Sequence, residues 1–75
     1  MNYGMLWFDN DPDTNLTKKV QRAVAYYHKK YGGTPDLCIV NPAMLAEKKT
    51  SAGEVEVEGS SAILPNHFWI GRRGL

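Results

Sequence analysis

Apolar residues recur at steps of three and four between positions 16 and 31, and this spacing constrains the fold more than any other feature of the chain. They are Leu16, Val20, Ala23, Val24, Tyr27 and Tyr31. A helix with 3.6 residues per turn places such residues in one stripe, so the segment predicts a single amphipathic helix packed on a core. Gly32 and Gly33 end the pattern, because glycine adopts the left-handed cap conformation without steric cost.

The start of this helix is predicted within the acidic segment 9–13, which reads DNDPD. Asp11 is a suitable N-cap, because its carboxylate can accept hydrogen bonds from free backbone N–H groups, and Pro12 suits the first helical position. Asp13 would then lie in the first turn and complement the positive end of the helix dipole, as the lysines of the last turn complement the negative end. Capping therefore accounts for all of the acidic residues except the first.

Two short apolar runs flank the helix, at 5–8 and 37–40, and each predicts a buried strand. A strand, a helix and a second strand in this order form a βαβ unit. The two strands of such a unit run parallel, adjacent or one strand apart, and its crossover is right-handed. This unit is expected to form the centre of the fold.

The remaining segments predict shorter elements. A short helix is expected over 43–49, with Pro42 at its first position. Residues 54–58 alternate between Glu and Val, which indicates a strand with one solvent-exposed face. The other expected segments are a loop at 50–53, a brief strand at 62–64, a final strand at 67–70 and a tail at 71–75.

Together these segments predict a small α/β (α+β) fold, in which one long helix packs on a mixed sheet of three to five strands. The sheet combines the βαβ unit with antiparallel strands from the C-terminal part. A chain of 75 residues forms one domain, residues 1–75, with a modest core. Glu54, Glu56 and Glu58 would discourage edge-to-edge pairing of the strand that carries them.

Composition limits the classes of function. The net charge is +1, so no whole-molecule field points to a nucleic acid or a membrane. The one cysteine, Cys38, lies in an apolar run, which excludes an internal disulfide and predicts a buried structural thiol. No disulfide framework fits a reducing compartment, and no apolar run has the length of a membrane span or a signal-peptide core. We therefore expect a cytoplasmic protein without a membrane partner.

The three aspartates Asp9, Asp11 and Asp13 have the spacing of the first three ligands of an EF-hand loop. The sixth position is Thr14 instead of glycine and the twelfth is Val20 instead of glutamate, so the most demanding positions are not met. An apolar strand followed by Asp-x-Asp also resembles the nucleophile loop of haloacid-dehalogenase-like phosphatases. Those enzymes need a much larger α/β domain, so neither activity is predicted.

Other chemical motifs are also missing from the sequence. His28 is expected on the surface of the helix, and His67 as a hydrogen-bonded structural residue at a strand start. Two histidines and one cysteine without a short spacing give no zinc signature. The chain contains no nucleophile elbow, phosphate-binding loop or dinucleotide fingerprint. We therefore predict a protein that is not an enzyme, with no catalytic residue, no metal and no cofactor.

One small-molecule site remains as a weaker alternative. Open α/β sheets place ligands at the carboxyl ends of their parallel strands. Asp9 and Asp11 follow the first expected strand and Asn41 follows the second. These three residues mark the place where such a ligand would bind.

A basic surface is the stronger alternative. Five cationic residues lie on the helix near Tyr26, and two more lie in the C-terminal tail. They are Lys18, Lys19, Arg22, Lys29, Lys30, Arg72 and Arg73. Basic residues beside an aromatic ring are the minimal requirement for nucleic-acid binding, so a nucleic-acid-binding accessory protein is one hypothesis. A solvated helix face with no partner is the other interpretation.

The leading hypothesis comes from the two apolar strands. In the first strand Met5 and Trp7 lie on one face and Leu6 and Phe8 on the other, and in the second strand Leu37 and Ile39 lie on one face and Cys38 and Val40 on the other. Strands that are apolar on both faces need a cover on each, and one long helix supplies only one cover. An apolar surface left open usually marks a partner site. We therefore predict a non-enzymatic interaction module that binds a protein partner, or a second copy of itself, on the face opposite the helix.

Two segments carry a resemblance to known proteins. "YYHKKYGGTPDLCIVNPAML" at 26–45 and "ILPNHFWIG" at 63–71 resemble a small family of uncharacterised bacterial proteins, over somewhat less than half of the chain. The resemblance implies a compact α/β domain and a bacterial, cytoplasmic setting. The family has no assigned activity, cofactor or catalytic residue, so the resemblance assigns no functional residue here.

Overall fold

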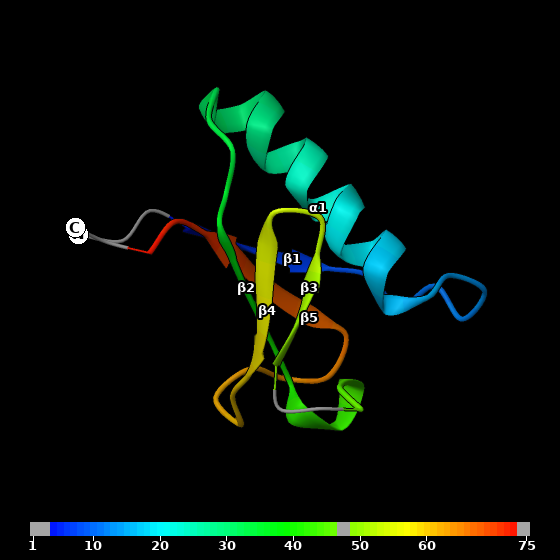
Figure 1. The fold of residues 1–75 in the computed structure, drawn as a ribbon. Coiled ribbons are helices and arrows are strands. Elements are labelled where there is room, and N and C mark those ends of the chain that lie inside the picture. Colours follow the sequence, from blue (N-terminus) through cyan, green and yellow to red (C-terminus); the bar gives the residue numbers. More distant parts are fainter. Residues whose placement is uncertain (1–3, 47–48, 74–75) are drawn as a thin grey trace.

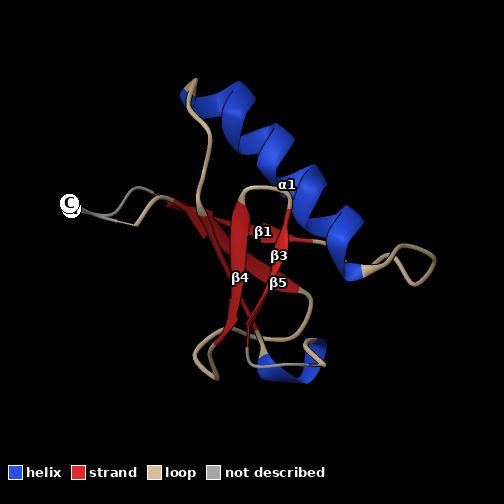
Figure 2. Cartoon of the chain, in the orientation of Figure 1, coloured by secondary structure: helices blue, strands red, loops and turns tan. Residues whose placement is uncertain are grey.

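A computed structural model describes residues 4–46 and 49–73. In this part of the chain five strands form one sheet, in the order β1-β5-β2-β4-β3. The elements are β1 (Gly4–Phe8), α1 (Leu16–Tyr31), β2 (Leu37–Val40), the 3-10 helix η1 (Pro42–Met44), β3 (Lys49–Ala52), β4 (Val55–Gly59) and β5 (His67–Gly71). The ribbon views show α1 lying along one side of the sheet (Figures 1 and 2). The fold is a small α+β domain with a mixed sheet, which confirms the predicted class.

β5 lies between β1 and β2 and runs antiparallel to both. β1 and β2 are therefore parallel with one strand between them, which is one of the two arrangements expected for the βαβ unit. β2 and β4 pair in parallel, whereas β3 and β4 form an antiparallel hairpin. This hairpin turns at Gly53, whose φ of 64° lies in the left-handed region that favours glycine.

The core lies between α1 and the helix-facing side of the sheet. Val20, Ala23 and Tyr27 of α1 are at most 2% exposed, and Phe68 and Ile70 of β5 are fully buried in the same cluster. Of the stripe predicted from the spacing, these three helix residues are buried, Leu16 and Val24 are partly buried against the core, and Tyr31 is 47% exposed. Burying an aliphatic or aromatic side chain of this kind stabilises the fold by about 1.5–3 kcal/mol.

The start of α1 differs from the prediction. The helix begins at Leu16, and its N-cap is Asn15, whose side-chain oxygen accepts the N–H of Lys18 at 2.9 Å. Asp11 and Pro12 therefore lie before the helix, and its first turn contains no acidic residue. The prediction of an Asp11 cap was wrong because asparagine caps a helix as well as aspartate does, and a later start still leaves the apolar stripe intact.

The end of α1 agrees with the prediction. Gly32 adopts the left-handed conformation, with φ of 77°, and its N–H donates to the carbonyl of His28 at 2.8 Å. His28, Lys29 and Lys30 lie in the last turn, where their position complements the negative end of the helix dipole.

Three shorter elements also differ from the prediction. The helix expected at 43–49 is the three-residue η1, and residues 47–48 lie outside the described part of the chain. The loop expected at 50–53 is mostly β3, whose polar sequence KTSA shows no apolar alternation. The strand expected at 62–64 is a turn, in which the N–H of Ile63 donates to the carbonyl of Ser60. Residues 49–52 form a strand because they pair with β4, and a local sequence pattern does not report such pairing.

Candidate functional site

The side of the sheet that faces away from α1 is the open face. Directly paired residues of neighbouring strands point to the same side of a sheet, and successive residues of one strand alternate between sides. The row that contains Cys38 packs against α1, so the next row, with Leu6, Trp69, Ile39 and Glu58, lies on the other side. The open face comprises Leu6 and Phe8 of β1, His67 and Trp69 of β5, Leu37 and Ile39 of β2, and Glu56 and Glu58 of β4.

Apolar surface on the open face is concentrated at β1. Leu6 is 62% exposed and Phe8 is 56% exposed, whereas Leu37 on the same face is only 7% exposed. The ring of Phe8 lies 5.0 Å from that of His67, centroid to centroid. The indole of Trp69 lies over Gly4, where a Cβ atom would collide with it. β1 and β5 therefore present a surface of aromatic and aliphatic groups.

The β4 side of the open face is acidic. Nη2 of Arg73 lies 2.7 Å from a carboxylate oxygen of Glu56 and 2.6 Å from one of Glu58. The backbone N–H of Arg73 also donates to Asp36 at 2.8 Å, so these contacts hold the C-terminal segment against β4. The hydrogen bond with Glu58, followed by the charges of Glu58, Glu56 and Asp36, raises the pKa of Arg73.

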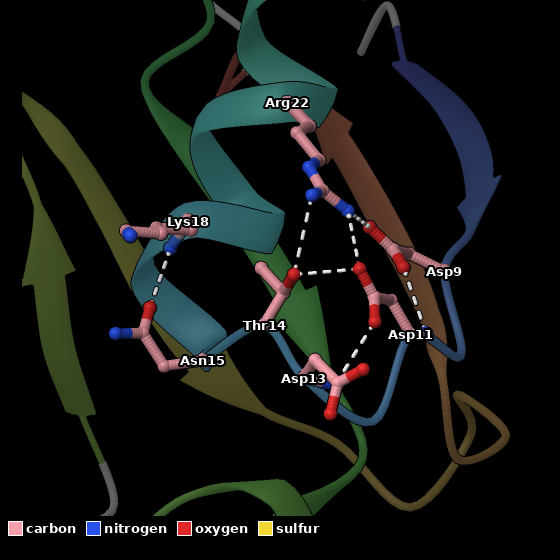
Figure 3. Close-up of polar contacts among 7 residues, drawn as sticks. All are labelled: Asp9, Asp11, Asp13, Thr14, Asn15, Lys18 and Arg22. Carbon is pink, nitrogen blue, oxygen red and sulfur yellow. Dashed lines mark hydrogen bonds and ion pairs between the residues drawn. The ribbon is translucent and has the colours of Figure 1, made fainter.

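The aspartates of the β1–α1 loop form a cluster closed by Arg22 (Figure 3). Asp9 accepts the N–H of Asp11 at 3.0 Å, and Asp11 accepts the N–H of Asp13 at 2.9 Å, so each carboxylate closes a local turn. Nη1 of Arg22 lies 3.3 Å from Asp9 and 3.2 Å from Asp11, and Nη2 donates to the hydroxyl of Thr14 at 3.2 Å. The cluster fastens the loop to the second turn of α1.

The charge state of this cluster follows from its hydrogen bonds. The hydroxyl of Thr14 donates to Asp11 at 2.6 Å, and this contact contributes most to lowering the pKa of Asp11 from 3.8 to about 2. The N–H of Asp13 and the guanidinium of Arg22 lower this pKa further. Asp11 and Asp9 in turn raise the pKa of Arg22. Two carboxylates and one guanidinium thus satisfy one another within the loop.

Only two of the three residues predicted for a small-molecule site lie together. Asp9 and Asp11, which follow β1, both contact Arg22. Asn41 uses its side chain elsewhere: its oxygen accepts the N–H of Ala43 at 2.9 Å as the cap of η1, and its amide donates to the carbonyl of Ile63 at 2.9 Å. Within residues 4–46 and 49–73, no group of three or more acidic, histidine or cysteine side chains is placed to hold a metal ion. Binding of a small molecule here stays a prediction.

The basic residues divide among several parts of the surface. Lys18, Arg22 and Lys29 lie on one line of the outer face of α1, since they are spaced by four and seven residues. Arg22, however, is paired with carboxylates, and Lys19 is only 8% exposed. The charged group of Lys30 lies 5.5 Å from the ring centroid of Tyr31.

The two tail arginines point to different places. Nη1 of Arg72 would lie 3.7 Å from a Cβ atom at Gly33, which places this guanidinium beside the C-terminal end of α1. Arg73 lies on the open face with the glutamates of β4. The tail therefore extends the basic surface of α1 by one charge and not by two.

The remaining reactive groups are in structural positions. Cys38 is fully buried in the core, and burial raises the pKa of its thiol to about 12. His67 makes a 2.9 Å hydrogen bond between its Nδ1 and the carbonyl of Pro65. The prediction of a buried thiol and that of a hydrogen-bonded histidine are both confirmed.

The alternation of side chains along β1 predicted that Leu6 and Phe8 share a face. The exposed fractions of these two side chains became visible only in the structure. The Arg22 cluster and the Arg73 contacts were missed, because they join residues 8 to 37 positions apart. The acidic run and the isolated Arg22 at a helical position were the only signals that could have indicated the first of them.

Comparisons of the chain with protein-family models, with curated proteins and with solved structures find no match. The resemblance to a bacterial family therefore stays a prediction. Among the described residues, no helix has the combination of length and apolar character needed to span a membrane.

Proposed function

We propose that the protein is a non-enzymatic interaction module that binds a protein partner through the open face. The observation that carries this proposal is the exposure of Leu6 and Phe8, at 62% and 56%, beside Trp69 on a face with no helix among the described residues. Contiguous apolar surface of this kind marks interaction sites in soluble proteins. Aromatic side chains in particular are enriched in the cores of protein interfaces.

The rigidity of this surface supports the proposal. Leu6 and Phe8 lie on a strand whose pairing with β5 spans all five residues of both strands. Phe8 is further held against His67, and Trp69 against Gly4. A surface fixed in this way loses little conformational entropy when a partner binds, which favours association.

The state of the reactive groups supports a non-enzymatic function. The carboxylates of Asp9 and Asp11 are both ion-paired with Arg22, and the thiol of Cys38 is buried with a raised pKa. A general base or a nucleophile needs an accessible group whose pKa is matched to its task. Each of these groups instead stabilises the loop or the core.

Photo-crosslinking tests the proposal. A benzophenone amino acid replaces Phe8 on the open face in one variant and Ala25, which is exposed on the outer face of α1, in the matched control. Both variants are produced in the native host and irradiated, and adducts are identified by mass. We expect discrete adducts from position 8 that are missing from position 25. Equal or no crosslinking at the two positions would contradict the proposal.

Nucleic-acid binding through α1 is the second candidate. Lys18 and Lys29 lie in line on the outer face, and the guanidinium of Arg72 lies beside the C-terminal end of the same helix. The pairing of Arg22 and Arg73 with carboxylates weakens this candidate, because it removes two of the seven cations from the surface that a phosphate backbone would contact.

Fluorescence anisotropy with labelled single- and double-stranded oligonucleotides tests this second candidate. Binding through lysine–phosphate contacts weakens steeply between low and near-physiological salt. The double variant Lys18→Glu/Lys29→Glu would abolish such binding, whereas the uncharged change Ile39→Thr on the open face, opposite α1, would leave it unchanged. A flat titration of the unmodified protein at low salt removes this candidate.

A further inference from the structure

The free edge of β1 is the one feature of the open face that specifies the form of its partner. Within residues 4–46 and 49–73, β1 pairs with β5 on one side only and is an end of the sheet. Which backbone groups point outward follows from the hydrogen-bond pattern. Opposed residues of antiparallel strands alternate between pairs that exchange hydrogen bonds and pairs whose N–H and C=O groups point away from each other.

The hydrogen bonds at the end of the ladder fix this alternation. The register pairs Phe8 with His67, so the next pair is Asp9 with Asn66. The N–H of Asp9 donates to the carbonyl of Asn66 at 2.9 Å, which makes this a hydrogen-bonded pair, and the N–H of His67 donates to Leu64 instead of Phe8. The backbone groups of Phe8, and by alternation those of Leu6 and Gly4, therefore point outward from the free edge.

β1 lacks the features with which proteins usually block a free edge. Its sequence GMLWF contains no charged residue and no proline. The other end of the sheet, β3, has the polar sequence KTSA and lies beside the three glutamates of the β4 segment. Charged and short polar edges prevent strand pairing between molecules, whereas an apolar edge with free backbone groups promotes it.

The same strand is complementary to itself when two copies run antiparallel. A two-fold axis at Leu6 pairs Leu6 with Leu6, Gly4 with Phe8 and Met5 with Trp7. The outward-pointing residues then meet in hydrogen-bonded pairs, and no two like charges oppose each other. Met5 meets an aromatic ring, which is a favourable contact for a thioether. A two-fold contact of this kind uses one surface patch on both copies.

We propose that the partner of β1 is the β1 of a second copy of this chain, paired antiparallel about Leu6 to form one continuous sheet through both copies. This inference rests on the proposed function and specifies its partner. The pairing involves five residues per copy and lies below the size of a standard interface, so the dimer is weak. It also extends the open face, because the exposed Leu6 and Phe8 side chains of both copies become neighbours.

Sedimentation equilibrium tests the pairing directly. Between about 10 μM and about 1 mM, a range suited to an interface of this size, the mean mass is expected to rise from 8.4 kDa toward twice that value. The variant Leu6→Pro removes the outward N–H at the two-fold axis and leaves the bonds between β1 and β5 intact, so we expect at least tenfold weaker association. The matched control Ile39→Thr alters the middle of the open face away from the edge and keeps the association constant.

Two outcomes overturn the inference. An unmodified protein that remains at 8.4 kDa over the whole range has no such dimer. Loss of association in Ile39→Thr together with its retention in Leu6→Pro would assign the contact to face-to-face packing and not to the edge.

Hydrogen exchange keeps the test decisive if Leu6→Pro fails to fold. In the unmodified protein, edge pairing increases the protection of the Leu6 and Phe8 amides with protein concentration, while the Asp9 amide, which already bonds to Asn66, changes little. Protection of the Leu6 and Phe8 amides that is independent of protein concentration contradicts the pairing.

The mass of the crosslinked adduct from position 8 distinguishes the edge dimer from the proposed function on which it rests. A mass of two chains supports the edge dimer, an adduct with a different protein leaves only the proposed function, and no adduct contradicts both.

Discussion

The two faces of the sheet differ far more in their surroundings than in their sequences. On the face toward α1, Phe68 and Ile70 of β5 are fully buried. On the open face, Leu6 and Phe8 of β1 are more than half exposed, although β1 is apolar on both sides. The comparison teaches that Leu6 and Phe8, unlike Met5 and Trp7 of the same strand, are not explained by packing within residues 4–46 and 49–73. Stability accounts for one face, and our proposal is that a partner accounts for the other.

The largest expected effect lies on the face toward α1. Phe68→Ala leaves a cavity beneath the helix, and such truncations of a buried phenylalanine cost about 3–5 kcal/mol. Urea denaturation followed by circular dichroism measures the change. The matched truncation Phe8→Ala on the open face should cost less than about 1 kcal/mol, because that ring is already largely in water. Equal losses of unfolding free energy in Phe68→Ala and Phe8→Ala would contradict the difference between the buried face and the open face.

Gly4→Ala tests how the open face is assembled. A Cβ atom at this position would overlap the indole of Trp69, so Trp69 must move, at a cost of about 1–3 kcal/mol. In Gly33→Ala, by contrast, the new Cβ atom meets only the end of Arg72 at an ordinary contact distance. We expect the control to be neutral or slightly stabilising in the same denaturation experiment. If both variants are equally stable, Trp69 does not lie over β1.

The Asp11 cluster holds the loop that places the helix over its face. Because the pKa of Asp11 is lower in the folded chain, its contribution to stability is complete above 3.8 and is lost as the pH falls toward about 2. Asp11→Asn should therefore lose stability at neutral pH and show a flatter dependence on pH below 3.8. The matched control is Asp13→Asn, whose carboxylate lies outside the contacts with Arg22, and denaturation at several pH values measures both variants. Parallel profiles for the unmodified protein and Asp11→Asn would contradict this role.

The smallest expected effect on stability is that of Leu6→Thr. The threonine introduces a β-branched side chain, which suits a strand, and removes apolar surface that is already 62% exposed, so the free energy of unfolding should change by no more than about 0.5 kcal/mol. Partner binding should weaken at the same time, as measured by the crosslinking yield from position 8. A large loss of stability would mean that Leu6 belongs to the core.

The sequence predicted what depends on local periodicity. The period of two separates Leu6 and Phe8 from Met5 and Trp7, and the period of 3.6 identifies the buried stripe of α1. The choice of Asn15 as the N-cap was not predictable in this way, because several residues before Leu16 are competent caps. The local sequence alone does not strongly favour one of these candidate N-cap residues over another.

Long-range pairing limited the rest of the prediction. β3 has no apolar alternation and becomes a strand because β4 pairs with it. The contact of Arg73 with Glu58 joins the C-terminal segment to a strand 15 residues earlier. The exposure of Phe8 likewise depends on where the only long helix of the described residues packs, which no local pattern reports.

Crosslinking from position 8, compared with position 25, tests the central claim that the open face is the surface that partners bind. The account predicts an adduct from position 8 alone, with the mass of two chains if the β1 edge pairs with its own copy. An equal yield from the outer face of α1, or no adduct from either position, would contradict the claim.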